Sequence, residues 1–73
     1  MTEYGVVLFF TTSSATQAEK VLGKAGLGTK LIPTPRQFSS DCGISLRFTW
    51  DDFNRVESLL RSANVEIMSI HQM

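Results

Sequence analysis

The chain has 73 residues, of which 42% are hydrophobic and 19% are charged, with seven Lys and Arg against seven Asp and Glu. This length and composition predict one folded domain spanning residues 1–73 and exclude an intrinsically disordered chain. The formal net charge of zero argues against a nucleic-acid partner or an anionic membrane partner, because such proteins carry a basic excess.

Membrane spans and metal clusters are also not expected. The longest apolar run, GVVLFF, is far shorter than the ~20 residues of a membrane-spanning helix. The N-terminal residues lack the basic and apolar regions of a signal peptide. One Cys and one His provide neither an internal disulfide nor a zinc-ligand cluster. We therefore expect a cytoplasmic protein with no metal, no cofactor and a reduced thiol.

The first half of the chain begins with a strand and a helix. Residues 4–10, YGVVLFF, form a continuous β-branched and aromatic run, typical of a strand in the middle of a sheet. Ser14 and Gln17 form a capping-box signal, which predicts a helix over residues 14–25. Apolar residues recur at helical spacing within it, and Gly26 stands where a left-handed residue would end the helix.

Two further strands are predicted on either side of a long connection. Residues 29–32 form a short strand that Pro33 and Pro35 end, because proline cannot donate a ladder hydrogen bond. A loop of about ten residues follows, longer than the 2–5 residues of most hairpin loops. Residues 44–49, ISLRFT, alternate between apolar and polar side chains, which predicts a half-buried strand.

A second helix and a last strand complete the pattern. Thr49 is the predicted N-cap of this helix, and two aspartates follow in its first turn. The apolar stripe of the helix consists of Phe53, Val56, Leu60 and Ala63. Asn64 is suited to the left-handed stop, and residues 65–70, VEIMSI, are the predicted last strand.

The order strand, helix, strand, strand, helix, strand predicts an α+β fold. Each helix has one apolar face, so both helices should lie on one face of a four-stranded antiparallel sheet. Right-handed crossovers then select the ferredoxin-like βαββαβ arrangement, with the first and third strands in the centre. The other sheet face would be open, and a homodimer could form through it.

Cys42, the single cysteine, is the main candidate for chemistry. A cysteine is nucleophilic as the thiolate, which Arg36 or Arg47 could favour and which the hydroxyls of Ser39 and Ser40 could assist. The long loop that ends at Cys42 is itself typical of a functional segment. The alternative is a small apolar residue buried beside a strand.

The strand pattern leaves the direction of this thiol open. Alternation places Cys42 on the buried side with Ile44, unless Gly43 breaks the register. The same alternation places Arg47 on the polar face of its strand. His71 is expected to be a surface histidine, since nothing in its spacing requires it to reach Cys42.

The segment LIPTPRQFSSDCGISLRF resembles the selenium/sulfur carrier-like proteins, which are small bacterial domains. The segment FFTTSSATQAEKVLGKAGL resembles the first strand and helix of the same family, so the likeness covers nearly the whole chain. The resemblance implies that Cys42 carries sulfur or selenium, as a persulfide or selenosulfide, between donor and acceptor proteins. It also implies supporting roles around the thiol: Arg36, Ser39, Ser40 and Gly43 would shape the loop, and Arg47 would be the neighbouring cation.

Two functions from different classes follow. The first is a sulfur or selenium carrier that is not a self-contained enzyme, since there is no second cysteine to resolve the intermediate. The second is a non-enzymatic interaction or dimerisation module in which Cys42 is structural. A phosphate-ester hydrolase of this fold would need an arginine in a glycine-rich loop after the first strand, and TTSS contains neither.

Overall fold

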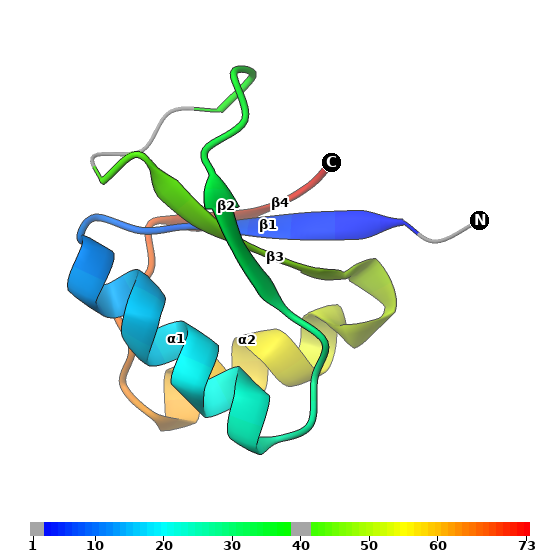
Figure 1. Cartoon of the computed structure of the whole chain (residues 1–73). Helices are drawn as coiled ribbons and strands as arrows, with labels where there is room; N and C mark the ends of the chain where they lie inside the picture. Colours follow the sequence, from blue (N-terminus) through cyan, green and yellow to red (C-terminus); the bar gives the residue numbers. More distant parts are fainter. Residues whose placement is uncertain (1–2, 39–41) are drawn as a thin grey trace.

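The computed structural model describes residues 3–38 and 42–73. Its elements are β1 (Tyr4–Leu8), α1 (Thr12–Lys24), β2 (Lys30–Pro33), β3 (Ile44–Thr49), the 3₁₀ turn η1 (Trp50–Asp52), α2 (Phe53–Ser62) and β4 (Ser69–Gln72). The four strands form one antiparallel sheet in the order β2-β3-β1-β4, and both helices lie on one of its faces (Figure 1). The predicted ferredoxin-like α+β arrangement, with β1 and β3 in the centre, is confirmed.

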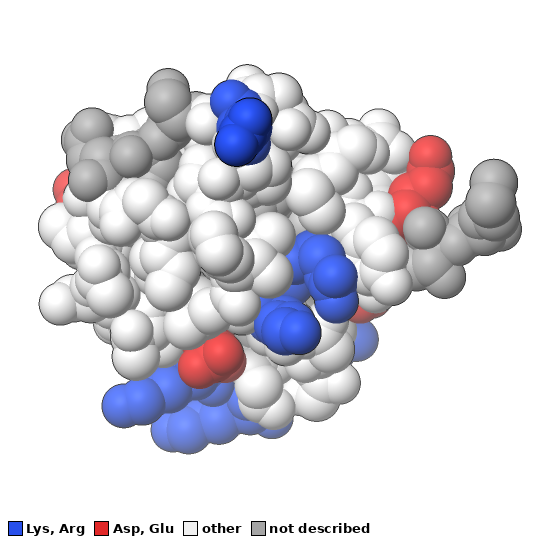
Figure 2. Space-filling view, turned by 45° about the horizontal axis from the view of Figure 1, so that its top comes forward, with Lys and Arg blue, Asp and Glu red and all other residues white. Residues whose placement is uncertain are grey.

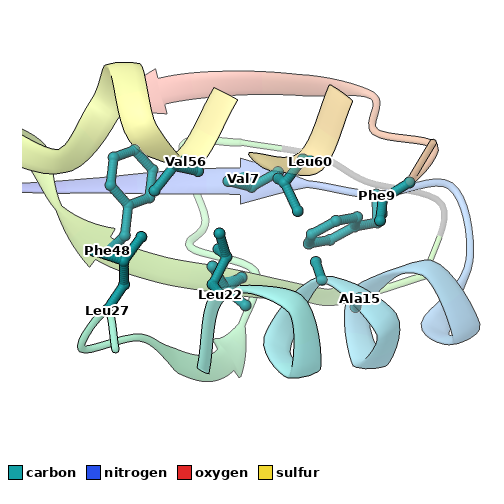
Figure 3. Close-up of a cluster of buried hydrophobic side chains, with 11 residues drawn as sticks. Val7, Phe9, Ala15, Leu22, Leu27, Phe48, Val56 and Leu60 are labelled. Atoms are coloured by element: carbon teal, nitrogen blue, oxygen red, sulfur yellow. The ribbon is translucent and has the colours of Figure 1, made fainter. Parts of the chain in front are cut away.

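The core lies between the sheet and the helices. Val7 of β1 pairs with Leu46 of β3, and both side chains are fully buried on the helix-facing side. Figure 3 shows Phe9 and Leu60 reaching the same layer from the sheet side and from α2. Full burial of each such side chain contributes about 1.5–3 kcal/mol. Alternation in β1 and β3 therefore determines which sheet face the helices cover.

Both helices end in the same hydrogen-bonded motif. Gly26 has a φ of 81°, and the N–H of Leu27 donates to the carbonyl of Leu22 at 3.1 Å. Asn64 has a φ of 57°, and the N–H of Val65 donates to the carbonyl of Leu60 at 3.0 Å. These are Schellman ends, in which a left-handed residue lets the chain satisfy the last carbonyls of a helix. The predicted stops at Gly26 and Asn64 are confirmed.

We expect Gly26→Ala to lower the free energy of unfolding by about 1 kcal/mol, because an L-residue with a Cβ is disfavoured at positive φ. A Cβ at Gly26 would meet no atom within 4 Å, so the backbone conformation is the whole cause. Gly28→Ala is the matched control, because Gly28 has the same open space and does not have a left-handed φ. Urea unfolding measures both variants, and equal stabilities would contradict this account.

The start of α1 differs from the prediction. The helix begins at Thr12, and Thr11 is its N-cap, with Oγ1 accepting from the N–H of Ser14 at 3.1 Å. The predicted capping box of Ser14 and Gln17 is therefore wrong. β1 ends at Leu8 instead of residue 10, although the side chain of Phe9 is still fully buried. Because the strand ends early, the first threonine of TTSS already has the extended backbone that an N-cap needs.

The start of α2 also differs. Thr49 makes no side-chain capping hydrogen bond, and η1 precedes the helix. The ring of Trp50 lies 5.9 Å from the ring of Phe48 and 4.9 Å from that of Phe53, measured between centroids. The N–H of Trp50 donates to the carbonyl of Glu3 at 2.9 Å. These tertiary contacts of Trp50 fix the chain here, where the sequence predicted a side-chain cap.

The last strand lies further along the chain than predicted. β4 is Ser69–Gln72, and the predicted span of residues 65–70 is wrong. Val65 is used to close α2, and the N–H of Met68 donates to the carbonyl of Leu8 at 2.7 Å, just before β4 begins. The resulting register places His71 opposite Val6 of β1.

The sheet face away from the helices is only partly open. Val6 and Ser45 are fully buried, although both lie outside the cluster that the helices cover. His71, the register partner of Val6, carries the ring of Phe38 stacked on it at a centroid distance of 4.7 Å. Residues 34–38, in the first half of the connection between β2 and β3, lie on this side of the sheet (Figure 1). The expected open face is thus reduced, and a homodimer through it stays a prediction.

Candidate functional site

Cys42 lies where the long connection meets β3. The residue is half-buried, and its side chain packs against the core cluster. Its Sγ lies 3.1 Å from the carbonyl oxygen of Ile44 and 3.4 Å from that of Phe9. Gly43, with a φ of 70°, supplies the turn between Cys42 and the strand. The thiol therefore lies on the core side, which is the alternative that strand alternation alone favoured, and Gly43 precedes the first residue of β3.

Two carbonyl oxygens lie within hydrogen-bonding distance of this sulfur. A thiol is a weak donor, and Sγ–H can donate to either oxygen. A thiolate has no proton to donate, so it gains nothing from these carbonyls. A reacting Cys42 must therefore turn its sulfur away from Phe9 and Ile44 or exchange these contacts for others.

Hydrogen bonds close the base of the connection that ends at Cys42. The N–H of Thr34 donates to the carbonyl of Gly43 at 3.1 Å, and the hydroxyl oxygens of Thr34 and Ser45 lie 2.8 Å apart. The N–H of Phe38 donates to the carbonyl of Pro35 at 3.0 Å, which forms a turn within the connection. No pattern in the sequence pointed to Thr34, Phe38 and Ser45 as supports of the site. For Ser45 in particular, burial was not expected, because a serine on the polar face of a strand is ordinarily exposed.

We expect Ser45→Ala to lower the free energy of unfolding by about 1 kcal/mol, because it leaves the partly buried hydroxyl of Thr34 without its partner. The same change should speed thiol labelling of Cys42, since the base of the connection is loosened. Urea unfolding and the rate of reaction with a maleimide measure these two effects.

The matched control for this pair is Thr34→Val, alone and combined with Ser45→Ala. We expect the double variant to lose less stability than the sum of the single variants, because neither hydroxyl is then left unpaired. Strict additivity, with no change in the labelling rate, would contradict a role for this hydrogen bond in holding the loop.

Arg47 is not brought to Cys42. Its guanidinium carbon lies 4.5 Å from the ring centroid of Tyr4, a cation–π contact. It pairs in register with Val6 on the sheet face away from the helices, and it lies about 10 Å along β3 from Ile44. Arg47 is also the cross-strand neighbour of Lys30, and Figure 2 shows basic side chains at several separate places on this view of the molecule. The structure thus does not support the expectation that Arg47 is the cation beside the thiol.

The other predicted site residues have different outcomes. Arg36 is exposed in the turn of the connection and makes no ion pair with a carboxylate of the described residues. Ser39 and Ser40 lie outside the described residues. His71 is half-buried, not a plain surface histidine, with Nε2 at 2.8 Å from the hydroxyl oxygen of Ser69.

In the part of the chain that the structure describes, there is neither a metal-binding group of side chains nor a helix that could span a membrane. Within residues 3–38 and 42–73, no group of three His, Cys, Asp or Glu side chains is placed to hold a metal ion. None of the helices in these ranges has the length and apolar character that crossing a membrane requires.

Comparisons with known proteins give one match. A family model described as "Putative Se/S carrier protein-like" matches residues 4–72. The matched span includes all the strands and helices described above, together with Cys42. A search of curated proteins and a search of solved structures gave no match.

Proposed function

Because the chain belongs to the Se/S carrier protein-like family, we propose that it carries a sulfur or selenium atom on Cys42 as a persulfide or selenosulfide. The observation that supports this proposal is the place of the single cysteine. Cys42 is half-buried at the end of a connection held at its base, so its sulfur can meet a donor by turning away from the two carbonyls while the rest of the domain stays folded. The family match spans the whole domain around it.

The transfer is a thiol exchange without net oxidation. The Cys42 thiolate attacks the terminal sulfur of a donor persulfide. A new bond forms between that atom and Sγ, the donor's own sulfur–sulfur bond breaks, and the donor leaves as its thiolate. The proton stays on the terminal sulfur, and the same balance holds when the terminal atom is selenium.

The absence of a second cysteine in the sequence shapes the rest of the proposal. No internal thiol can attack the loaded Cys42, so release requires an acceptor in another molecule. The chain then acts as a carrier between donor and acceptor proteins of sulfur or selenium metabolism, and it is not a self-contained enzyme. A cytoplasmic location fits this role, since thiols remain reduced there.

The test is to incubate the reduced protein with glutathione persulfide, or with its selenium analogue, and record the intact mass. We expect one added chalcogen atom per chain, removable by a small thiol. Absence of any adduct on folded protein would overturn the carrier proposal.

The packing of Cys42 favours one second candidate. Its side chain contacts the core cluster, as a small buried hydrophobe would, so the thiol can serve as a structural residue in an interaction module. In that case labelling should be slow in the native state and Cys42→Ser should lose stability, while no chalcogen adduct forms. These results together would select the interaction module over the carrier.

A further inference from the structure

Phe10 is an exposed aromatic residue whose backbone lies close to the thiol. Its side chain is 42% exposed, and it directly follows Phe9, whose carbonyl oxygen lies 3.4 Å from Cys42 Sγ. Standard peptide geometry places that oxygen about 2.8 Å from the next Cα, so the Cα of Phe10 lies within about 6 Å of the sulfur. The backbone that carries this exposed ring thus lies close to the sulfur.

The chain on either side of Phe10 is held in place. Phe9 is fully buried in the core (Figure 3), and Thr11 is the N-cap of α1 through its hydrogen bond to Ser14. Phe10 therefore stands between two anchored residues, and little chain entropy remains to be lost when a partner covers it. A pre-positioned aromatic of this kind is typical of the residues that dominate binding at protein interfaces.

We propose that Phe10 is the docking anchor for the protein that gives its chalcogen to Cys42. This inference rests on the proposed function. Transfer brings the partner's reacting atom to a bond length of about 2.05 Å from the sulfur of Cys42, so the partner's surface must close over residues within 6 Å or so of it. The partner fitted by this surface has an apolar pocket beside its reactive sulfur.

The residues that follow Phe10 at the start of α1 are uncharged. The first turn of α1 contains no acidic residue, and Thr11, Thr12 and Ser13 are exposed hydroxyl side chains. A small donor such as glutathione persulfide has no surface large enough to cover the Phe10 ring. Phe10 should therefore matter for transfer between proteins and not for loading by small molecules.

The experiment compares two donors on three proteins. The donors are glutathione persulfide and a cysteine desulfurase that carries a persulfide formed from L-cysteine. The proteins are the native chain, Phe10→Ser and Tyr4→Ser, where Tyr4 is a matched aromatic that is 38% exposed at the opposite end of β1. The second-order rate constant for loading Cys42 is measured by intact mass, and thermal unfolding checks that each variant is folded.

We expect Phe10→Ser to lower the rate with the protein donor by about tenfold, which corresponds to about 1.4 kcal/mol of lost interface energy. Its rate with glutathione persulfide should be unchanged, and Tyr4→Ser should change neither rate. Equal rates for Phe10→Ser and the native chain with the protein donor would overturn the inference, as would an equal loss with both donors. If the native chain loads from neither of the two donors, the proposed function itself is overturned.

Discussion

Replacing Cys42 by serine is expected to abolish the chalcogen adduct completely. A hydroxyl is too weak a nucleophile to attack a persulfide at neutral pH, while its O–H can still donate to the carbonyl oxygen of Phe9 or Ile44. The fold should therefore persist while the chemistry is lost. Intact mass after incubation with glutathione persulfide, together with urea unfolding of the variant, measures the two parts of this prediction.

The matched control for the thiol is Arg47→Met. The guanidinium of Arg47 lies over Tyr4 on the face away from the helices, so its loss should leave the loading rate of Cys42 unchanged. A large fall in that rate would show that Arg47 acts on the thiol and would contradict the separation seen in the structure. An adduct on Cys42→Ser equal to that of the native chain would place the chemistry elsewhere.

Gly5→Ala is expected to lower the free energy of unfolding by about 3 kcal/mol, a large part of the roughly 4–11 kcal/mol typical of a domain of this size. Gly5 pairs with Phe48 in the sheet, and the ring of Phe48 lies over it. A Cβ at Gly5 would fall 2.5 Å from Cζ of Phe48 and 2.6 Å from Cε3 of Trp50. Both rings would have to move, which disturbs their stack and the start of α2.

The control for this prediction is Gly23→Ala. Gly23 lies in α1, and a Cβ there would meet no atom within 4 Å. Alanine at that position should raise the free energy of unfolding by about 0.5–1 kcal/mol, because glycine disfavours the helix interior. Urea unfolding of both variants separates the steric effect from the general effect of adding a methyl group. Equal and small changes would show that the ring of Phe48 moves aside at little cost.

The local signals in the sequence were sufficient for the architecture. Alternation over residues 44–49 placed Leu46 and Phe48 toward the helices, and the structure confirms this. Gly26 and Asn64 marked the ends of the helices, because the left-handed conformation restricts which residues can occupy such positions. These features depend on neighbours within a few positions along the chain, so a pattern of residues is enough to reveal them.

The sequence pattern did not predict which of several possible residues caps α1 or where β4 begins. Thr11 caps α1 in place of Ser14, because the backbone after β1 is already extended at Thr11. β4 begins at Ser69, because residues 65–68 close α2 and meet the end of β1 before the strand starts. Both outcomes are set by where another strand ends, which a local pattern does not contain.

The sequence by itself determined that one thiol stands at the junction of a long connection and a central strand, and it left open whether this thiol faces the core or the solvent. Only the tertiary structure decided its surroundings. It placed Cys42 Sγ beside the carbonyl of Phe9, 33 positions away along the chain, and it placed Arg47 over Tyr4 instead of over the thiol. It also buried Ser45 and paired the Ser45 hydroxyl with that of Thr34. The physical reason is that these contacts join strands and loops distant in sequence, so they follow from sheet register and chain path, and residue type alone does not specify them.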